Sequence, residues 1–281
     1  MSDNQKTLNS SIEFTGVGLH TGEDVHMVIE PAKINHGVKF QRIDLENQPI
    51  LPADINLVTD TQRSTTLEKD NVKIVTVEHL MSALYALGVN NVLIKLDSSE
   101  VPILDGSAKY FVEEIQKVGL KVQDAPLKYI DLPNPIHYTD PDSGSEILFV
   151  PTNTFIISVV LDYQNHALGT QYAEIRDLKN YSTEIAPCKT FVFLTELEKL
   201  SKANLIKGGE LENAIVVVDR EDINPSEIKK LAHLLGKDDF EIQINGNILN
   251  NCEMQFHNEP ARHKLLDVIG DLALIGMPIK G

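Results

Sequence analysis

The sequence is poor in cysteine, has no long apolar run and has no excess of basic residues. Its two cysteines, Cys188 and Cys252, form no Cys-x-x-Cys pair, which excludes a cysteine-rich zinc site. A low cysteine count is also typical of a reducing compartment. No run of about 18 apolar residues is present, and the polar first residues lack the apolar core of a secretory signal. These absences predict a cytoplasmic protein without a spanning helix.

The charge balance limits the partners of the chain. Lys and Arg number 25 against 41 Asp and Glu, so the formal net charge is −16. A general nucleic-acid binder needs a basic surface that releases counterions, so this class is excluded. An anionic small substrate stays compatible with the sequence, because a local group of basic side chains can act within an acidic protein.

The order of the expected elements predicts an α+β fold in two domains. The 281 residues suffice for two domains of ordinary size. Each half has strands followed by helices, and the pattern restarts near residue 126, which predicts domains at 1–126 and 127–281. The expected helices are 76–87, 106–119, 194–205 and 258–276, and the expected strands include 24–30, 37–43, 91–96, 146–150, 155–161 and 214–219. A hairpin insertion is expected between 234 and 260, with an Asn-Gly-Asn turn.

Two polar clusters lie within these otherwise apolar helices. One is Glu78-His79, and the other is His263, Asp267 and Asp271, which share one helical face at i, i+4 and i+8. Two imidazoles and one carboxylate form a three-ligand zinc set that leaves a fourth position for water. A further carboxylate beside that water, Glu78, is what metal-assisted hydrolysis needs.

Each cluster also has a structural interpretation that the sequence leaves open. Acids are favoured at helix N-termini, so Glu78 has a reason to be there without chemistry, and Thr76 is a candidate N-cap. A solvated polar stripe would explain the second cluster without any metal. The glycine-rich segment 16–22 lacks the GxGxxG spacing of a dinucleotide site and is interpreted as a turn between strands.

Seven segments together closely resemble the zinc-dependent UDP-3-O-acyl-N-acetylglucosamine deacetylases, which act in lipid A synthesis in Gram-negative bacteria. The Glu-His pair and the His-Lys-x-x-Asp-x-x-x-Asp spacing are highly specific to that family. The matching segments occur in family order over nearly the whole chain: 15–22, 52–54, 76–80, 102–108, 190–191, 208–209 and 262–272.

The resemblance implies two similar domains, each a layered β-α-α-β sandwich, with the active site between them. It implies that His79, His263 and Asp267 bind Zn²⁺, although Fe²⁺ would suit the same ligands. Glu78 would be the general base that activates a zinc-bound water. The other implied catalytic residues are Thr190, which would hydrogen-bond the oxyanion, Lys264, which would stabilise negative charge, and Asp271, which would pair with a general acid.

The resemblance also implies how the substrate is held. Phe191 would pack on the sugar, and an insert at about 194–218 would form an apolar passage for the acyl chain. The candidate passage residues are Leu197, Leu200, Ile206, Gly208 and Gly209. The substrate would be UDP-3-O-acyl-N-acetylglucosamine, and contact with the inner membrane would be peripheral.

The family pattern continues beyond Gly281 with a strand and a helix that carry the general-acid histidine. The chain is therefore expected to be C-terminally incomplete, and some relatives have a fused hydroxyacyl-carrier-protein dehydratase domain at that place. Two alternatives follow: a zinc hydrolase of the same fold acting on another acylated sugar nucleotide, and a catalytically silent zinc protein that binds an acylated sugar nucleotide.

Overall fold

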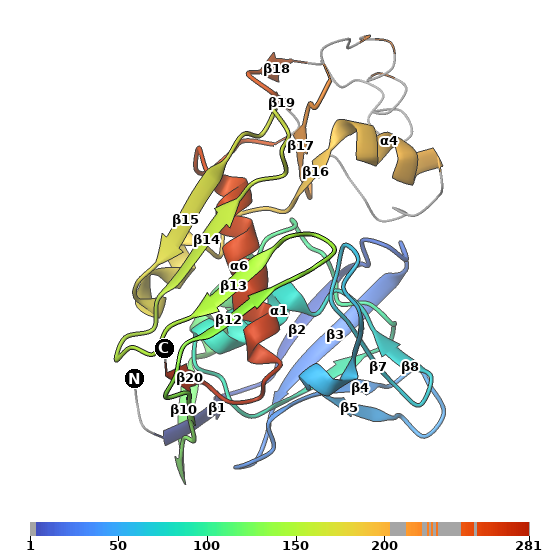
Figure 1. Ribbon diagram of the computed structural model, residues 1–281. Coiled ribbons are helices and arrows are strands. Elements are labelled where there is room, and N and C mark those ends of the chain that lie inside the picture. Colours follow the sequence, from blue (N-terminus) through green and yellow to red (C-terminus); the bar gives the residue numbers. More distant parts are fainter. Residues whose placement is uncertain are drawn as a thin grey trace.

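The computed structural model in Figure 1 describes residues 4–202, 212–220, 224, 226, 229, 243–249 and 252–280. Helices and strands are mixed in this part of the chain, which confirms the predicted α+β class. The helices are α1 (Glu78–Ala86), α2 (Lys109–Val118), α3 (Tyr181–Glu184), α4 (Leu194–Lys202) and α6 (Glu259–Ala273), with 3-10 turns η1 (Ile55–Leu57) and η2 (Leu178–Asn180).

The strands pair into several small sheets. The largest has the order β2-β3-β9-β4-β5 and is antiparallel except where β4 runs parallel to β9. Its strands are β2 (Ile12–Val17), β3 (Asp24–Pro31), β9 (Val92–Leu96), β4 (Val38–Arg42) and β5 (Ile50–Pro52). In β3, every second side chain is buried, as expected for a strand with one face on the core.

The remaining sheets are smaller. In the first half of the chain, β1 (Asn4–Leu8) pairs with β10 (Leu120–Pro126), and β6 (Val58–Asp60), β7 (Thr66–Lys69) and β8 (Val72–Ile74) form a three-stranded sheet. In the second half, β12 (Ile136–Thr139) pairs with β13 (Glu146–Phe149), and β14 (Ile157–Leu161) pairs with β15 (Gln171–Ile175). β11 (Ile130–Asp131) runs parallel to β20 (Ile279–Lys280). A four-stranded sheet contains β16 (Phe191–Phe193), β17 (Ile215–Val217), β19 (Ile248–Leu249) and β18 (Ile244–Asn245).

Helices α1 and α6 pack against each other at the centre of the molecule (Figure 1). Helix α6 also packs on β14 and β15, whereas α2 packs on β2, where the rings of Phe14 and Phe111 meet edge to face at 5.1 Å. One apolar cluster includes buried side chains from the large sheet, α1 and α6. The core therefore joins the two halves of the sequence at the α1–α6 contact.

A glycine permits this close helix crossing. A Cβ atom at Gly270 would lie 2.1 Å from the backbone oxygen of Glu78, so the two helices would have to move apart. We expect Gly270→Ala to lower the free energy of unfolding by about 1–3 kcal/mol, since overpacking outweighs the gain of up to about 1 kcal/mol that alanine brings to a helix. Urea unfolding measures this. A variant as stable as the wild type would contradict the close crossing.

Several expected boundaries differ from the structure by a few residues. The helices expected from 76 and 106 begin at Glu78 and Lys109. The predicted Asn-Gly-Asn turn joins β18 and β19, with Gly246 in the left-handed region. Residues 234–242, 250 and 251 of the predicted insertion, together with Ile206, Gly208 and Gly209, lie outside the described residues. Within the described part of the chain, no helix has both the length and the apolar character needed to cross a membrane.

Candidate metal centre

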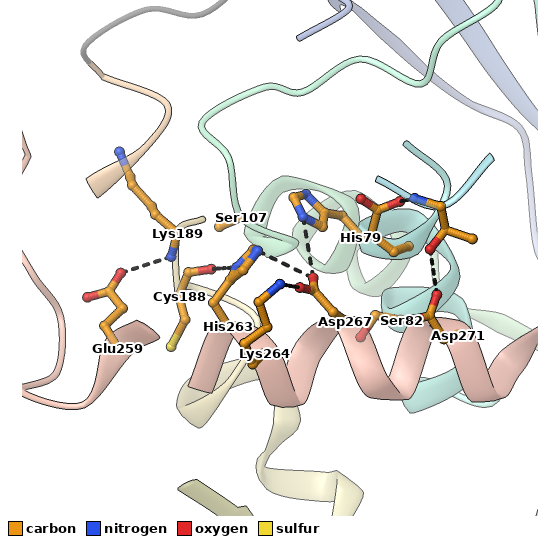
Figure 2. A network of polar contacts seen from close by, with 12 residues as sticks. His79, Ser82, Ser107, Cys188, Lys189, Glu259, His263, Lys264, Asp267 and Asp271 are labelled. Carbon is orange, nitrogen blue, oxygen red and sulfur yellow. Dashed lines mark hydrogen bonds and ion pairs between the residues drawn. The ribbon is translucent and has the colours of Figure 1, made fainter. Parts of the chain in front are cut away.

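Two packed helices bring three potential metal ligands together. His79 lies in the first turn of α1, whereas His263 and Asp267 lie one turn apart on α6. Asp267 Oδ1 is 3.3 Å from Nε2 of His263 and 3.7 Å from Nε2 of His79. One potential ligand atom of each residue lies within 4.8 Å of the others. Figure 2 shows the three side chains converging between the helices.

The protonation of His263 follows from its hydrogen bond. Nδ1 of His263 is 3.0 Å from the carbonyl oxygen of Cys188, and because a carbonyl only accepts, Nδ1 carries the proton. Burial lowers the pKa of His263, and burial together with the neighbouring His263 lowers the pKa of His79 to about 3. Both rings are therefore neutral at pH 7, and the unprotonated Nε2 of His263 faces a carboxylate oxygen.

Asp267 supplies an ionised carboxylate with one unpartnered oxygen. Burial acts to raise its pKa, but positive charge from His263 when protonated and from Lys264 holds the pKa of Asp267 below its usual value. Oδ2 accepts from Nζ of Lys264 at 2.9 Å, whereas the buried Oδ1 has no hydrogen-bond partner among the described residues.

The donor set fits a tetrahedral cation. Oδ1 of Asp267 and the unprotonated Nε2 of His263 face each other, and Nε2 of His79 lies 3.7 Å from the same oxygen. A cation between these three atoms would be bound by all of them. Ligand atoms about 2.0–2.1 Å from a tetrahedral zinc ion lie roughly 3.3–3.5 Å apart, which is close to the two carboxylate–imidazole distances.

Glu78, Thr65 and Asp271 form a second group beside the three ligands. The backbone N–H of Thr65 donates to Oε2 of Glu78 at 3.0 Å, and its hydroxyl donates to Oδ1 of Asp271 at 2.7 Å. Burial and the negative charge of Asp267 raise the pKa of Glu78 to about 8. Partial burial raises the pKa of Asp271 to about 6. Part of this residue is exposed to solvent, and water screens its charge there. Sequence reasoning missed Thr65, since no motif marks it.

The hydroxyl of Thr65 is expected to stabilise the fold. Thr65→Val leaves a carboxylate oxygen without its donor, so the free energy of unfolding should fall by about 1–2 kcal/mol. Urea unfolding of the metal-free protein measures this, with Thr65→Ser retaining most of the stability. Thr66→Val, the same change at the next buried position, is the control for lost packing. Equal stability of the wild type, Thr65→Val and Thr66→Val would disprove the expectation.

Thr190 and Phe191 follow closely in sequence after Cys188, whose backbone carbonyl accepts a hydrogen bond from His263. The backbone N–H of Thr190 donates to Gly106 O at 2.9 Å, and a Cβ at Gly106 would lie 3.3 Å from Cγ2 of Thr190. The ring of Phe191 contacts that of Tyr163 edge to face at 5.9 Å. Tyr163, which sequence reasoning also missed, contributes to the raised pKa of Lys264 after the larger effect of Asp267. The contacting rings of Phe191 and Tyr163 therefore lie near α6, the helix that carries His263 and Asp267.

The predicted passage residues are only partly described. Leu197 is buried on α4, and Glu196 of the same helix forms a 2.6 Å ion pair with Arg63. Leu200 belongs to α4, but its side chain is not described. Ile206, Gly208 and Gly209 lie outside the described residues, so their predicted role stays a prediction.

The predicted N-cap at Thr76 is wrong. The cap position of α1 is Val77, which makes no side-chain cap bond, and Thr76 has a φ of 59°. Its hydroxyl instead donates to the fully buried carboxylate of Glu100 at 2.8 Å. A buried carboxylate needs donors, and this tertiary demand overrides the local capping preference.

Glu100 also fixes the glycine-rich loop between β2 and β3. It accepts hydrogen bonds from the backbone N–H groups of His20 and Thr21 and from the Thr21 hydroxyl. A Cβ at Gly18 would lie 2.3 Å from Oγ1 of Thr21 and 2.4 Å from Oε2 of Glu100, so a side chain there would displace the hydrogen bond between these two groups. The loop joins two antiparallel strands, as predicted.

The fold and the cluster define an α+β protein with a candidate metal centre between two packed helices. A sequence model of the family described as UDP-3-O-acyl N-acetylglycosamine deacetylase matches residues 5–232 and 236–281. The chain belongs to this family.

Individual relatives agree with this assignment. The chain is 47% identical over 277 residues to the bifunctional enzyme LpxC/FabZ of Bacteroides thetaiotaomicron, covering 99% of this chain and 60% of the relative. It is 39% identical over 280 residues to the UDP-3-O-acyl-N-acetylglucosamine deacetylase of Hahella chejuensis, covering 99% of this chain and 83% of the relative. It is 36% identical over 274 residues to the enzyme of the same name from Thermosynechococcus vestitus, covering 98% of this chain and 86% of the relative. The chain thus spans about 60% of the length of the bifunctional relative.

Proposed function

We propose that this protein hydrolyses the acetamide of UDP-3-O-acyl-N-acetylglucosamine, giving the free amine and acetate, in lipid A synthesis. The observation that carries the proposal is the convergence of His79, His263 and Asp267 around one unpartnered carboxylate oxygen, with Glu78 beside them. Membership of the deacetylase family supports the choice of substrate.

His79, His263 and Asp267 would hold Zn²⁺, and Fe²⁺ would suit the same ligands. A bound ion supplies Lewis acidity that stabilises negative charge on the amide oxygen. The neutral state of both imidazoles suits this role, because only an unprotonated nitrogen can bind a cation. The carboxylate of Asp267 supplies the negative charge in the ligand set.

Glu78 would act as the general base. Its carboxyl would take a proton from the water that attacks the amide carbon, and burial together with Asp267 raises its pKa towards the neutral range where a base is most effective. The Thr190 hydroxyl and the Lys264 ammonium would stabilise the oxyanion. Asp271, held by Thr65, would orient the donor that protonates the leaving nitrogen.

Phe191 would pack on the sugar of the substrate, beside Tyr163. The insert at about 194–218, with Leu197, Leu200, Ile206, Gly208 and Gly209, would form the acyl passage. Each buried methylene adds about 0.8 kcal/mol, so such a passage can measure chain length. We further propose two domains, 1–126 and 127–281, each a layered β-α-α-β sandwich.

We place the protein in the cytoplasm, in peripheral contact with the inner membrane. No disulfide joins Cys188 and Cys252 in the described structure, which suits a reducing compartment. The bifunctional names of some relatives support a fused dehydratase domain in the parent protein, which the intact mass of the native polypeptide would test.

The decisive experiment is deacetylation of UDP-3-O-acyl-N-acetylglucosamine by this chain and by the native polypeptide. Each is assayed after chelation and after Zn²⁺ is restored, with a series of acyl lengths. We expect zinc-dependent release of acetate that varies with acyl length. Zinc-independent release would contradict the metal role, and no release by either protein would overturn the proposed function.

A further inference from the structure

One peptide group connects a buried carboxylate to the ligand His263. The carbonyl oxygen of the Cys188–Lys189 peptide is 3.0 Å from Nδ1 of His263. The N–H of the same peptide, which belongs to Lys189, donates to Oε1 of Glu259 at 2.9 Å. Figure 2 shows this chain running from Glu259 through the peptide to the imidazole. Glu259 and His263 lie one turn apart on α6, so the helix holds both ends of the chain.

The environment of Glu259 makes its charge significant. The residue is fully buried, and its other oxygen, Oε2, accepts from the backbone N–H groups of Gln255 and Phe256. In the described structure, the three groups that donate hydrogen bonds to this carboxylate are all neutral backbone amides. A buried carboxylate among neutral donors polarises them strongly, because the low local dielectric does not screen its field.

We propose that Glu259 is a positioning residue for the metal centre, acting through the Cys188–Lys189 peptide. Its charge polarises the peptide, so the carbonyl of Cys188 accepts more strongly from Nδ1–H of His263. This fixes the tautomer and ring orientation of His263 and makes its Nε2 a better donor to a cation. The inference rests on the proposed zinc site. In many metal sites a carboxylate contacts the histidine directly; in this chain a peptide group lies between them.

In a purely structural role, Glu259 would only hold the loop before α6 through hydrogen bonds. The two roles differ in their need for charge. Loop holding requires hydrogen-bond acceptors, and its loss would lower stability. Polarisation requires a negative charge, and its loss would change the His263 imidazole and the affinity for the metal.

The test compares Glu259→Gln with Glu253→Gln in the full chain. Glu253 is exposed in the segment just before α6, so its substitution removes the same charge without touching the peptide. Zinc affinity is measured by competition with a chelator, and the Nδ1–H signal of His263 is recorded by ¹⁵N NMR in the metal-free protein. Glu259→Asp keeps the charge and provides a second variant if Glu259→Gln unfolds.

We expect Glu259→Gln to weaken zinc binding by roughly 10–100-fold and to shift the His263 signal, with Glu253→Gln unchanged. Glu259→Asp should lie closer to the wild type than Glu259→Gln. Unchanged zinc affinity and an unchanged His263 signal in Glu259→Gln, even with reduced thermal stability, would overturn the proposal. A wild type that binds no zinc would overturn the metal site, and the NMR comparison would then decide the peptide connection by itself.

Discussion

Asp267→Ala is expected to abolish zinc binding and to lower the deacetylation rate by at least about 10³-fold. The substitution removes the only anionic member of the ligand set and leaves two neutral imidazoles. Losing several kcal/mol of transition-state charge stabilisation corresponds to a rate effect of this size. Zinc per chain is measured by elemental analysis, and the rate is measured at saturating zinc. His79→Ala should have the same two effects.

Val268→Ala is the matched control for this prediction. Val268 lies next to Asp267 on the same helix and is 37% exposed, so its truncation tests helix perturbation without removing a ligand. Retention of one zinc per chain and full activity in both Asp267→Ala and His79→Ala would sink the assignment of these residues as ligands.

Glu78→Gln is expected to lower kcat by about 10²–10⁴-fold while the zinc content stays unchanged. The amide oxygen of glutamine can still accept from the N–H of Thr65, so the local hydrogen bond survives. The amide cannot take up a proton, so the base is lost. Steady-state kinetics together with zinc analysis separate this effect from ligand loss.

The same base predicts the direction of the pH dependence. A general base works when deprotonated, so the rate should fall as pH drops through the pKa of Glu78. Burial and the charge of Asp267 raise this pKa to about 8 in the metal-free protein. A cation bound to Asp267 would lower it, so the acidic limb of kcat/KM should lie below pH 8. Glu68→Gln, which changes a half-buried carboxylate paired with Lys73, is the control. Wild-type kcat in Glu78→Gln would exclude this residue as the base.

Residue spacing along the chain was enough to locate the local part of the site. The spacing of His263 and Asp267 places both side chains on one helical face, because four residues make about one turn. The same reasoning located Glu78-His79 at the start of a helix and predicted the turn between β2 and β3. The α+β class also followed from sequence, since alternating and helical patterns depend on short stretches of chain.

Packing between distant segments brings these parts together. His79 and His263 belong to different helices, and the crossing that brings their rings within 4.8 Å requires Gly270. No local pattern shows that Thr65 bridges Glu78 and Asp271, or that one peptide group lies between Glu259 and His263. Likewise, the Thr76 hydroxyl donates to the buried carboxylate of Glu100 and does not cap α1 as expected. Local spacing therefore identified the candidate ligands. Their proximity in space, and the groups that hydrogen-bond to them, depend on packing between distant segments. The physical reason is that burial determines which polar atoms must find partners.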